Sequence, residues 1–164
     1  LRFIYSGGSP LDPTIKLETE QLFGLTLLNA YGMTESGPTI CQVRYNERLD
    51  SCSVGRPLPG MDVKVLDPHG QPVVMGEVGE LHVRGPNVMR GYFRNPDATA
   101  AVIDAEGYLN TGDLVRLDAG GNVHIAGRSK GIPPIAMCRS GPPTAERRSP
   151  CATKSPKSKA SPPS

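Results

Sequence analysis

The sequence predicts an α/β unit followed by an antiparallel β unit, with a C-terminal tail that forms no core. A strand–helix–strand pattern fills residues 1–29, and short alternating strands separated by tight turns fill residues 62–126. No hydrophobic periodicity continues beyond Lys130. We therefore place units at 1–54 and 55–130, followed by a tail.

The first unit begins with an apolar run over residues 1–6, which we expect to be a short buried strand. Asp12 suits a helix N-cap, and Pro13 suits the first helical position. The predicted helix ends at Gly24, and residues 25–29 form the second strand. A strand, a helix and a strand with short connections indicate a βαβ-like unit and a mostly parallel sheet.

The second unit alternates apolar and polar residues with a period of two, which is typical of strands that are buried on one face. Turn sequences occur at 67–70 and 118–122, and a short helix is predicted at 95–101. We expect an antiparallel sheet or a small distorted barrel. Its predicted strands are 62–66, 79–84, 112–117 and 122–126.

The tail, residues 131–164, contains eight prolines, six basic residues and one acidic residue. Such a segment cannot bury enough apolar surface to offset its chain entropy, so we expect disorder. The composition changes abruptly after Lys130 to a sequence rich in Pro, Arg, Ser and Ala, which is typical of an out-of-frame reading of a GC-rich gene. An alternative is an interaction protein whose basic tail binds acidic partners or nucleic acid, but the tail has no aromatic residue for stacking on bases.

Charge and cysteine content exclude several classes of function. Without the tail, 12 basic and 15 acidic residues leave a mildly acidic body, so we expect no nucleic-acid partner. The four cysteines form no CxxC pair, which argues against a zinc site or a disulfide framework. No apolar stretch approaches the length of a membrane span. We expect a cytoplasmic protein without a membrane span.

Two motifs follow the predicted strands of the first unit. The run Tyr5-Ser6-Gly7-Gly8-Ser9 would let a ligand approach the backbone closely, or it is an ordinary tight turn. In Asn29–Pro38, Tyr31 offers an aromatic face for a base, Thr34 a hydroxyl for a phosphate, and Glu35 a carboxylate for Mg²⁺. The alternative for this second motif is a polar loop.

Three further motifs lie in the second unit. Residues 79–92 alternate like a strand, and we interpret them as structural. Asp113, in Tyr108–Leu114, suits the two hydroxyl donors of a ribose, or it caps a turn. The run Gly127-Arg128-Ser129-Lys130 could contact a phosphate or ribose, or form a solvated basic turn.

The order and spacing of these motifs, together with Ser53–Gly60, resemble the adenylate-forming superfamily over residues 1–130. That superfamily includes acyl-CoA synthetases, peptide-synthetase adenylation domains and luciferases. The resemblance implies the distal half of the large N-terminal domain. It also implies activation of a small carboxylic acid by ATP to an acyl-adenylate with loss of pyrophosphate, then transfer to CoA. The expected cofactors are ATP or AMP and Mg²⁺, with CoA as co-substrate.

The resemblance also assigns roles to residues. Tyr31 would pack on adenine, Asp113 would bind the ribose hydroxyls with help from Arg128, Glu35 would hold Mg²⁺, and Lys130 would lie at the hinge between two domains. Thr34 would bond a phosphate oxygen, and Gly8 and Ser9 would line the acyl and adenine pocket. The implied nucleotide-binding set is Gly8, Ser9, Asn29, Ala30, Tyr31, Gly32, Thr34, Asp113 and Arg128.

The chain also departs from the family pattern. It has no Gly/Ser/Thr-rich phosphate loop, and Lys154, Lys157 and Lys159 do not lie in the family's catalytic lysine motif. We therefore assign no catalytic residue, expect a fragment that is inactive alone, and expect weak ATP binding. The alternatives are a fragment of an adenylation domain that loads a carrier protein, or a non-catalytic remnant.

Overall fold

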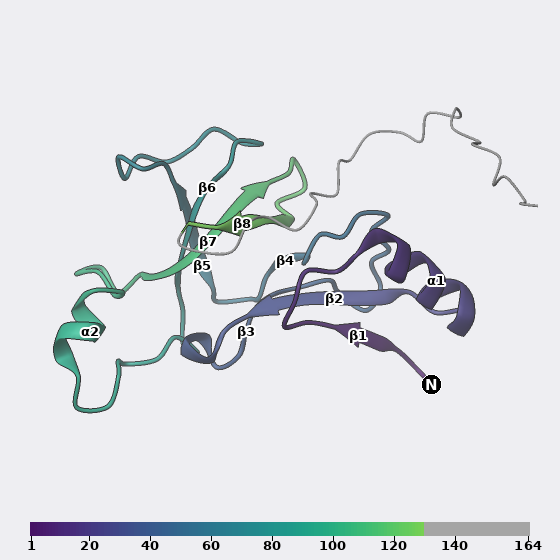
Figure 1. The fold of residues 1–164 in the computed structure, drawn as a ribbon, viewed down its shortest axis with the longest axis horizontal. Coiled ribbons are helices and arrows are strands. Elements are labelled where there is room, and N and C mark those ends of the chain that lie inside the picture. Colours follow the sequence, from purple (N-terminus) through teal and green to yellow (C-terminus); the bar gives the residue numbers. More distant parts are fainter. Residues whose placement is uncertain (130–164) are drawn as a thin grey trace, which may run out of the picture.

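The computed structural model describes residues 1–129, which form two four-stranded sheets and two α-helices (Figure 1). The expectations of a hinge at Lys130 and of a disordered or out-of-frame tail at 131–164 lie outside the described residues. Within residues 1–129, no helix has the length and apolar character that a membrane crossing requires.

The first sheet contains β1 (Ile4–Ser6), β2 (Leu27–Gly32), β3 (Thr39–Gln42) and β4 (Arg56–Pro57), in that order. The strands β1 and β2 are parallel, as the strand–helix–strand pattern predicts. The expectation of a mostly parallel sheet is wrong, because β3 and β4 pair antiparallel. A short 3₁₀ turn, η1 (Thr34–Ser36), and Gly37 at φ 54° reverse the chain directly after β2, so β3 must run back along it.

The helix α1 (Pro13–Phe23) forms where its caps predict it. Asp12 Oδ1 accepts hydrogen bonds from the amides of Thr14 at 2.7 Å and Ile15 at 3.2 Å. Gly24 ends the helix in the left-handed conformation, at φ 62°. Glu20 Oε1 accepts the amide of Leu27 at 2.9 Å and therefore ties the helix to the start of β2.

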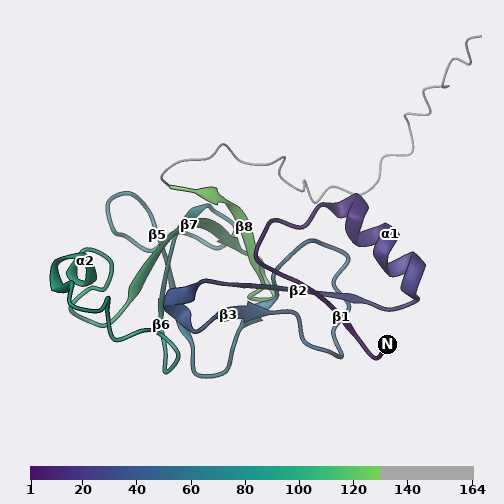
Figure 2. The ribbon, with the colours of Figure 1, turned by 60° about the horizontal axis from the view of Figure 1, so that its bottom comes forward.

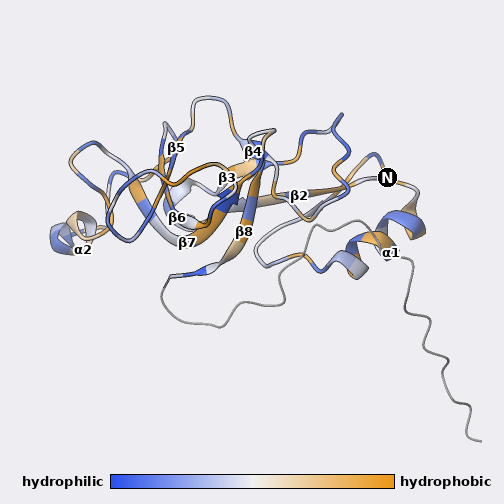
Figure 3. Ribbon diagram, turned by 90° about the horizontal axis from the view of Figure 1, so that it is seen from above, coloured by the Kyte–Doolittle hydropathy of each residue, from blue (hydrophilic) through white to orange (hydrophobic). Residues whose placement is uncertain are grey.

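The prediction that residues 1–6 are buried is wrong. Leu1 is 87% exposed, Phe3 51% and Tyr5 48%. Only Gln42, which donates to the Tyr5 hydroxyl, and the ring of Tyr45, which lies against Phe3, are seen to contact this face among the described residues, and they leave both rings about half exposed. The apolar residues of α1 are also exposed. Figure 3 shows hydrophobic ribbon on this helix although it lies at the edge of the described fold. We call Leu1, Phe3, Ile15, Leu17, Leu22 and Phe23 the apolar face.

The second sheet is antiparallel throughout and contains β5 (Asp62–Leu66), β6 (Gly79–Arg84), β7 (Leu109–Leu117) and β8 (Val123–Arg128). Its order is sequential with β5 and β8 at the edges, which matches the antiparallel-sheet alternative. The strand β7 starts three residues before the predicted 112, because the burial alternation already begins at Leu109. The second helix, α2 (Pro96–Ala100), lies within the predicted 95–101.

The two sheets share one core. The core cluster combines Ile40 and Cys41 of β3 with Leu81, Val83 and Val115 of β6 and β7. The views of Figures 1 and 2 agree that the second sheet and α1 lie toward opposite ends of β2. The strand β4 follows the boundary proposed between residues 54 and 55, yet it pairs with β3 of the first sheet.

The segment 53–55 joins the sheets through backbone and hydroxyl groups. The amide of Val54 and the Ser53 hydroxyl both donate to the carbonyl oxygen of Val123, at 3.0 and 2.8 Å. The amide of Val123 donates to the Gly55 carbonyl at 2.8 Å. This network holds β8 against the first sheet and thereby positions the residues discussed next.

Candidate functional site

The parallel pairing of β1 and β2 brings their carboxyl ends to one edge of the first sheet. Ser6 pairs with Asn29, so the loop that follows β1 lies beside Ala30. A Cβ atom added to Gly7 would lie 3.4 Å from the Ala30 carbonyl oxygen. Gly8 adopts φ 82°, and both Gly8 and Ser9 are exposed. Ligands of open α/β sheets bind at such an edge.

Asn29 belongs to the predicted binding set, but its side chain is used inside the protein. It is 3% exposed, its Nδ2 donates to the Cys52 carbonyl at 3.1 Å, and its Oδ1 accepts the amide of Ala30 at 3.1 Å. These bonds fix the backbone in the middle of β2. Asn29 therefore supports the backbone of the binding edge, and its side chain does not face a ligand.

Tyr31, Asp113 and Arg128 meet although they come from three different strands. The Tyr31 hydroxyl donates to Asp113 Oδ2, and Arg128 Nε donates to Asp113 Oδ1 at 2.8 Å. Asp113 is only 4% exposed, whereas the Arg128 side chain is exposed. Burial and the Asp113 hydrogen bond raise the pKa of Tyr31 well above its ordinary value. Each carboxylate oxygen keeps a further lone pair for another donor.

The prediction placed Tyr31 and Gly32 in a loop, but both belong to β2. Gly32 is required there, because a Cβ atom would lie 1.7 Å from the carbonyl oxygen of Pro38. The turn that follows is fixed by Ser36, which is fully buried and whose Oγ accepts the amide of Met33 at 3.1 Å. Thr34 is exposed in the turn and Glu35 is half-buried.

Residues 85–92, which we call the clasp segment, follow β6 and make hydrogen bonds to this turn. Asn87 Nδ2 lies 2.7 Å from the carbonyl oxygens of both Ser36 and Thr39. The amide of Met89 donates to the Glu35 carbonyl at 2.8 Å, and the Tyr92 hydroxyl donates to Glu35 Oε1 at 2.9 Å. The interpretation of this motif as structural missed its contact with Glu35. No local pattern could reveal it, since Tyr92 and Glu35 are 57 positions apart.

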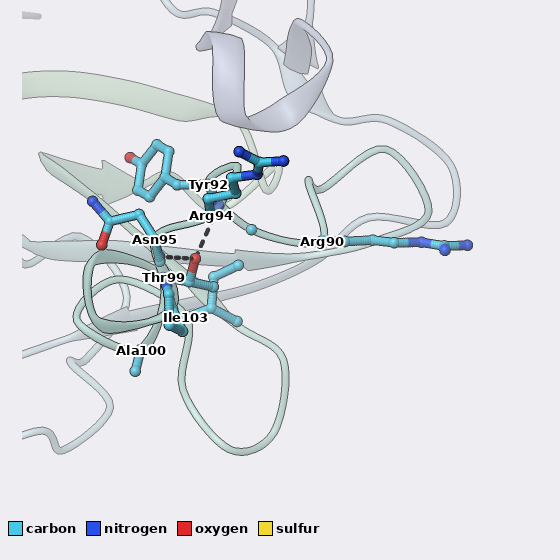
Figure 4. A pocket seen from close by; sticks show the side chains of 9 residues that line it. Arg90, Tyr92, Arg94, Asn95, Thr99, Ala100 and Ile103 are labelled. Atoms are coloured by element: carbon cyan, nitrogen blue, oxygen red, sulfur yellow. Dashed lines mark hydrogen bonds between the residues drawn. The ribbon is translucent and has the colours of Figure 1, made fainter.

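A shallow hollow of about 520 Å³ lies beside the clasp segment (Figure 4). Tyr92 links it to Glu35, but Tyr31, Asp113 and Arg128 do not line it. In Figure 4 the side chains of Arg90 and Tyr92 extend in opposite directions. The hollow is therefore separate from the place where the predicted nucleotide-binding residues meet. Its lining residues are Arg90, Gly91, Tyr92, Arg94, Asn95, Pro96, Thr99, Ala100 and Ile103.

The turn can supply one carboxylate to a divalent cation. Among residues 1–129 no three His, Cys, Asp or Glu side chains are grouped as a metal site would require. Glu35 Oε1 accepts the Tyr92 hydroxyl, and within the described part of the chain no partner is seen for Oε2. Mg²⁺ is commonly held by one or two carboxylates with phosphate oxygens and water. These residues fit Mg²⁺ bound together with a nucleotide.

Comparisons with known proteins agree with this geometry. Residues 1–93 match the family described as AMP-binding enzyme. The chain is 41% identical over 130 residues to a long-chain-fatty-acid–CoA ligase of Yersinia pestis, covering 79% of this chain and 23% of the ligase. It is also 41% identical over 133 residues to a probable 4-coumarate–CoA ligase of Dictyostelium discoideum, covering 79% of this chain and 24% of that protein.

Solved structures give the same result. ATP-bound MatB from Rhodopseudomonas palustris superimposes with a TM-score of 0.73 at 37% identity, covering 79% of this chain and 26% of MatB. The amide bond synthetase McbA from Marinactinospora thermotolerans gives 0.72 at 34% identity, covering 79% and 26%. The chain therefore spans about a quarter of the length of these relatives.

Proposed function

Since this chain belongs to the family of AMP-binding enzymes, we propose that it forms part of an ATP-dependent acyl-CoA synthetase. The enzyme would convert a carboxylate and ATP to an acyl-adenylate and pyrophosphate. It would then transfer the acyl group to the thiol of CoA and release AMP. The meeting of Tyr31, Asp113 and Arg128 beside the edge of β1 and β2 supports this proposal most directly.

Asp113 is the ribose-binding group of the proposed site. A carboxylate has about four lone-pair positions, and Tyr31 and Arg128 occupy one on each oxygen. One acceptor position is left on each oxygen, which matches the two hydroxyl donors of a ribose. Tyr31 offers its ring to the adenine, and exposed Arg128 offers its remaining N–H groups to the sugar or phosphate.

The turn after β2 is the phosphate end of the site. Thr34 would donate to a phosphate oxygen, and Glu35 would hold Mg²⁺. When bound, this cation neutralises charge that develops on the phosphate oxygens during displacement of pyrophosphate. Gly8, Ser9, Ala30 and Gly32 contribute backbone that a nucleotide and an acyl group can approach closely. The relatives differ in their named acids, so we propose only the class of carboxylic acid.

This chain supplies the proposed nucleotide-binding residues, and we assign no catalytic lysine to it, so we expect no ligase turnover from it alone. We propose that Lys130 lies at the hinge between the large and the small domain of the complete synthetase. A cytoplasmic location with CoA and a carboxylic acid as partners is part of the same proposal. An ATP–pyrophosphate exchange assay on the 164-residue chain should show no exchange.

Saturation-transfer NMR with millimolar AMP tests the binding function, because it detects weak complexes. We expect a signal from the unsubstituted chain and its loss in Asp113→Asn, which removes charge from the ribose acceptor. The matched control is Asp97→Asn, which changes an exposed carboxylate of α2 and should bind AMP normally. Equal AMP signals from the two variants would overturn the proposed site. Thermal unfolding of each variant excludes loss of the fold.

A further inference from the structure

Glu35 is held by the clasp segment at two points. The Met89 amide donates to its backbone carbonyl at 2.8 Å, and the Tyr92 hydroxyl donates to its side-chain Oε1 at 2.9 Å. A glutamate at the tip of a turn otherwise turns freely about its side-chain bonds, and its terminal torsion has broad preferences. The first contact holds the backbone of Glu35, and the second directs its carboxylate.

Tyr92 is itself anchored by α2. Its amide donates to Thr99 Oγ1 at 2.9 Å, and Thr99 Oγ1 donates to the Asn95 carbonyl at 2.9 Å (Figure 4). Thr99 can approach this closely only because residue 91 is glycine. At Gly91 the backbone has φ 145°, and a Cβ atom would lie 2.7 Å from the Thr99 methyl carbon. These contacts hold the backbone at Tyr92, from which the hydroxyl reaches Glu35.

We propose that Tyr92 is a positioning residue that turns the Glu35 carboxylate so that Oε2 faces the cation of a bound nucleotide. The inference rests on the proposed function of Glu35 and adds to it a residue from the connection between β6 and α2. By donating to Oε1, Tyr92 leaves Oε2 free for the metal and fixes its direction. Partners of this kind orient metal-binding groups in many proteins.

The test is the gain in ATP affinity that Mg²⁺ gives the full 164-residue chain, measured by ligand-observed NMR with and without Mg²⁺. Tyr92→Phe removes only the hydroxyl. It should reduce the gain by about tenfold, the lower end of the loss seen when such partners are removed. Its ATP affinity without Mg²⁺ and its thermal unfolding midpoint should stay unchanged. Glu35→Gln should abolish the gain.

The matched control is Tyr45→Phe, which removes the hydroxyl of an exposed tyrosine outside the site and should keep the full gain. A second measurement uses the unsubstituted fold: with ¹³C-labelled tyrosine, the Tyr92 Cζ resonance should shift when Mg²⁺ joins ATP. It should not shift in Glu35→Gln.

The possible outcomes separate the two ideas. A full gain in Tyr92→Phe, together with a lost gain in Glu35→Gln, overturns the positioning role alone. A gain that Glu35→Gln leaves intact overturns the cation role of Glu35 and the inference with it. A lower unfolding midpoint of Tyr92→Phe with an unchanged gain assigns the hydroxyl to fold stability.

Discussion

At the level of single residues, the candidate site is built around Asp113, a carboxylate that is almost completely buried. Burial of a charged group is costly unless donors surround it. Tyr31 and Arg128 supply those donors from β2 and β8. The same two contacts that make the carboxylate tolerable in the fold also orient it toward the edge where a ribose would lie.

Tyr31→Phe should therefore destabilise the protein. It leaves Asp113 Oδ2 buried without the hydroxyl that now donates to it, and such losses cost about 1–3 kcal/mol. Urea unfolding followed by circular dichroism measures the change. Tyr45→Phe, an exposed tyrosine, is the control and should lie within about 0.5 kcal/mol of the unsubstituted chain. An unchanged midpoint for Tyr31→Phe would contradict the described contact.

Cys41 should be unreactive in the folded protein. Burial raises the pKa of its thiol to about 12, so almost no thiolate exists near neutral pH. At pH 8, about 4 units below this pKa, roughly one thiol in ten thousand is ionised. Alkylation with iodoacetamide at pH 8, followed by peptide mass spectrometry, should therefore leave Cys41 unmodified for about an hour or more, and should label it within minutes in 8 M urea. Rapid labelling without urea would show that β3 is not packed as described.

At the level of secondary structure, the sequence predicted best where the signal is local. Asp12, Pro13 and Gly24 mark the ends of α1 because caps depend only on neighbouring residues. The strands β3 and β4 were not predicted, since their short segments form strands only by pairing with each other and with β2.

Some residues of the candidate site could also be predicted from the sequence, and others could not. The resemblance brought Tyr31, Asp113 and Arg128 together, and the structure places them in contact. It gave no sign of Asn87 or Tyr92, whose partners lie some fifty positions away in the chain. Contacts of this kind depend on how the sheets pack and leave no periodic signal.

Two glycines with nearly the same φ should respond differently to alanine. Gly55, at φ 77°, lies against β3, and a Cβ atom would be 2.2 Å from the Gln42 carbonyl carbon. Gly70, at φ 76°, has open space around it. Gly70→Ala should cost about 1 kcal/mol of strain, whereas Gly55→Ala should cost several times more (roughly 3 kcal/mol or above) because backbone must move. Urea unfolding of both variants measures the difference, and equal losses would contradict the close approach.

The turn between β7 and β8 should lose stability in acid. Burial alone would raise the pKa of Asp118, but hydrogen bonds from His124, Asn122 and Gly120 outweigh it and lower the pKa to about 2. A carboxyl whose folded pKa is depressed stabilises the fold above its unfolded value, about 3.9. That contribution is lost as the pH falls from about 4 to about 2.

Asp118→Asn should therefore be less stable than the unsubstituted chain by about 1–2 kcal/mol at pH 7, after allowance for partial exposure of the carboxyl. The difference between the two unfolding free energies should shrink below pH 4. Urea titrations at several pH values compare the two chains, so that the other carboxyl groups cancel. A difference that stays constant from pH 7 to pH 2 would refute the assigned interactions.

At the level of the whole molecule, the described residues form one core but leave the apolar face uncovered. Exposed apolar side chains of this kind, where they gather, mark a place of contact with other protein surface or a risk of aggregation. The chain spans about a quarter of its relatives, so the proposed synthetase would contain much more polypeptide than these two sheets.

Replacing one residue of the apolar face should improve solution behaviour without loss of stability. Leu22 is 77% exposed, and lysine has nearly the same helix propensity as leucine, so Leu22→Lys should change stability by less than about 0.5 kcal/mol. It should lower the binding of the dye ANS and the concentration-dependent light scattering. Val74→Lys, an exposed apolar residue elsewhere, is the matched control and should change neither. A similar decrease in both variants would argue against a distinct face.

The bonds between segment 53–55 and Val123 also determine when this protein can fold during its synthesis. Ser53 and Val123 are 70 positions apart and Val123 begins β8, so a ribosome must release the chain as far as the start of β8 before these bonds can form. Ile40 and Cys41 of β3 pack with residues of β6 and β7, so they stay exposed until those later strands have been made. Closing such a long loop late slows folding. The nascent chain would therefore expose the β2–β3 hairpin to chaperones for longer than its small size suggests.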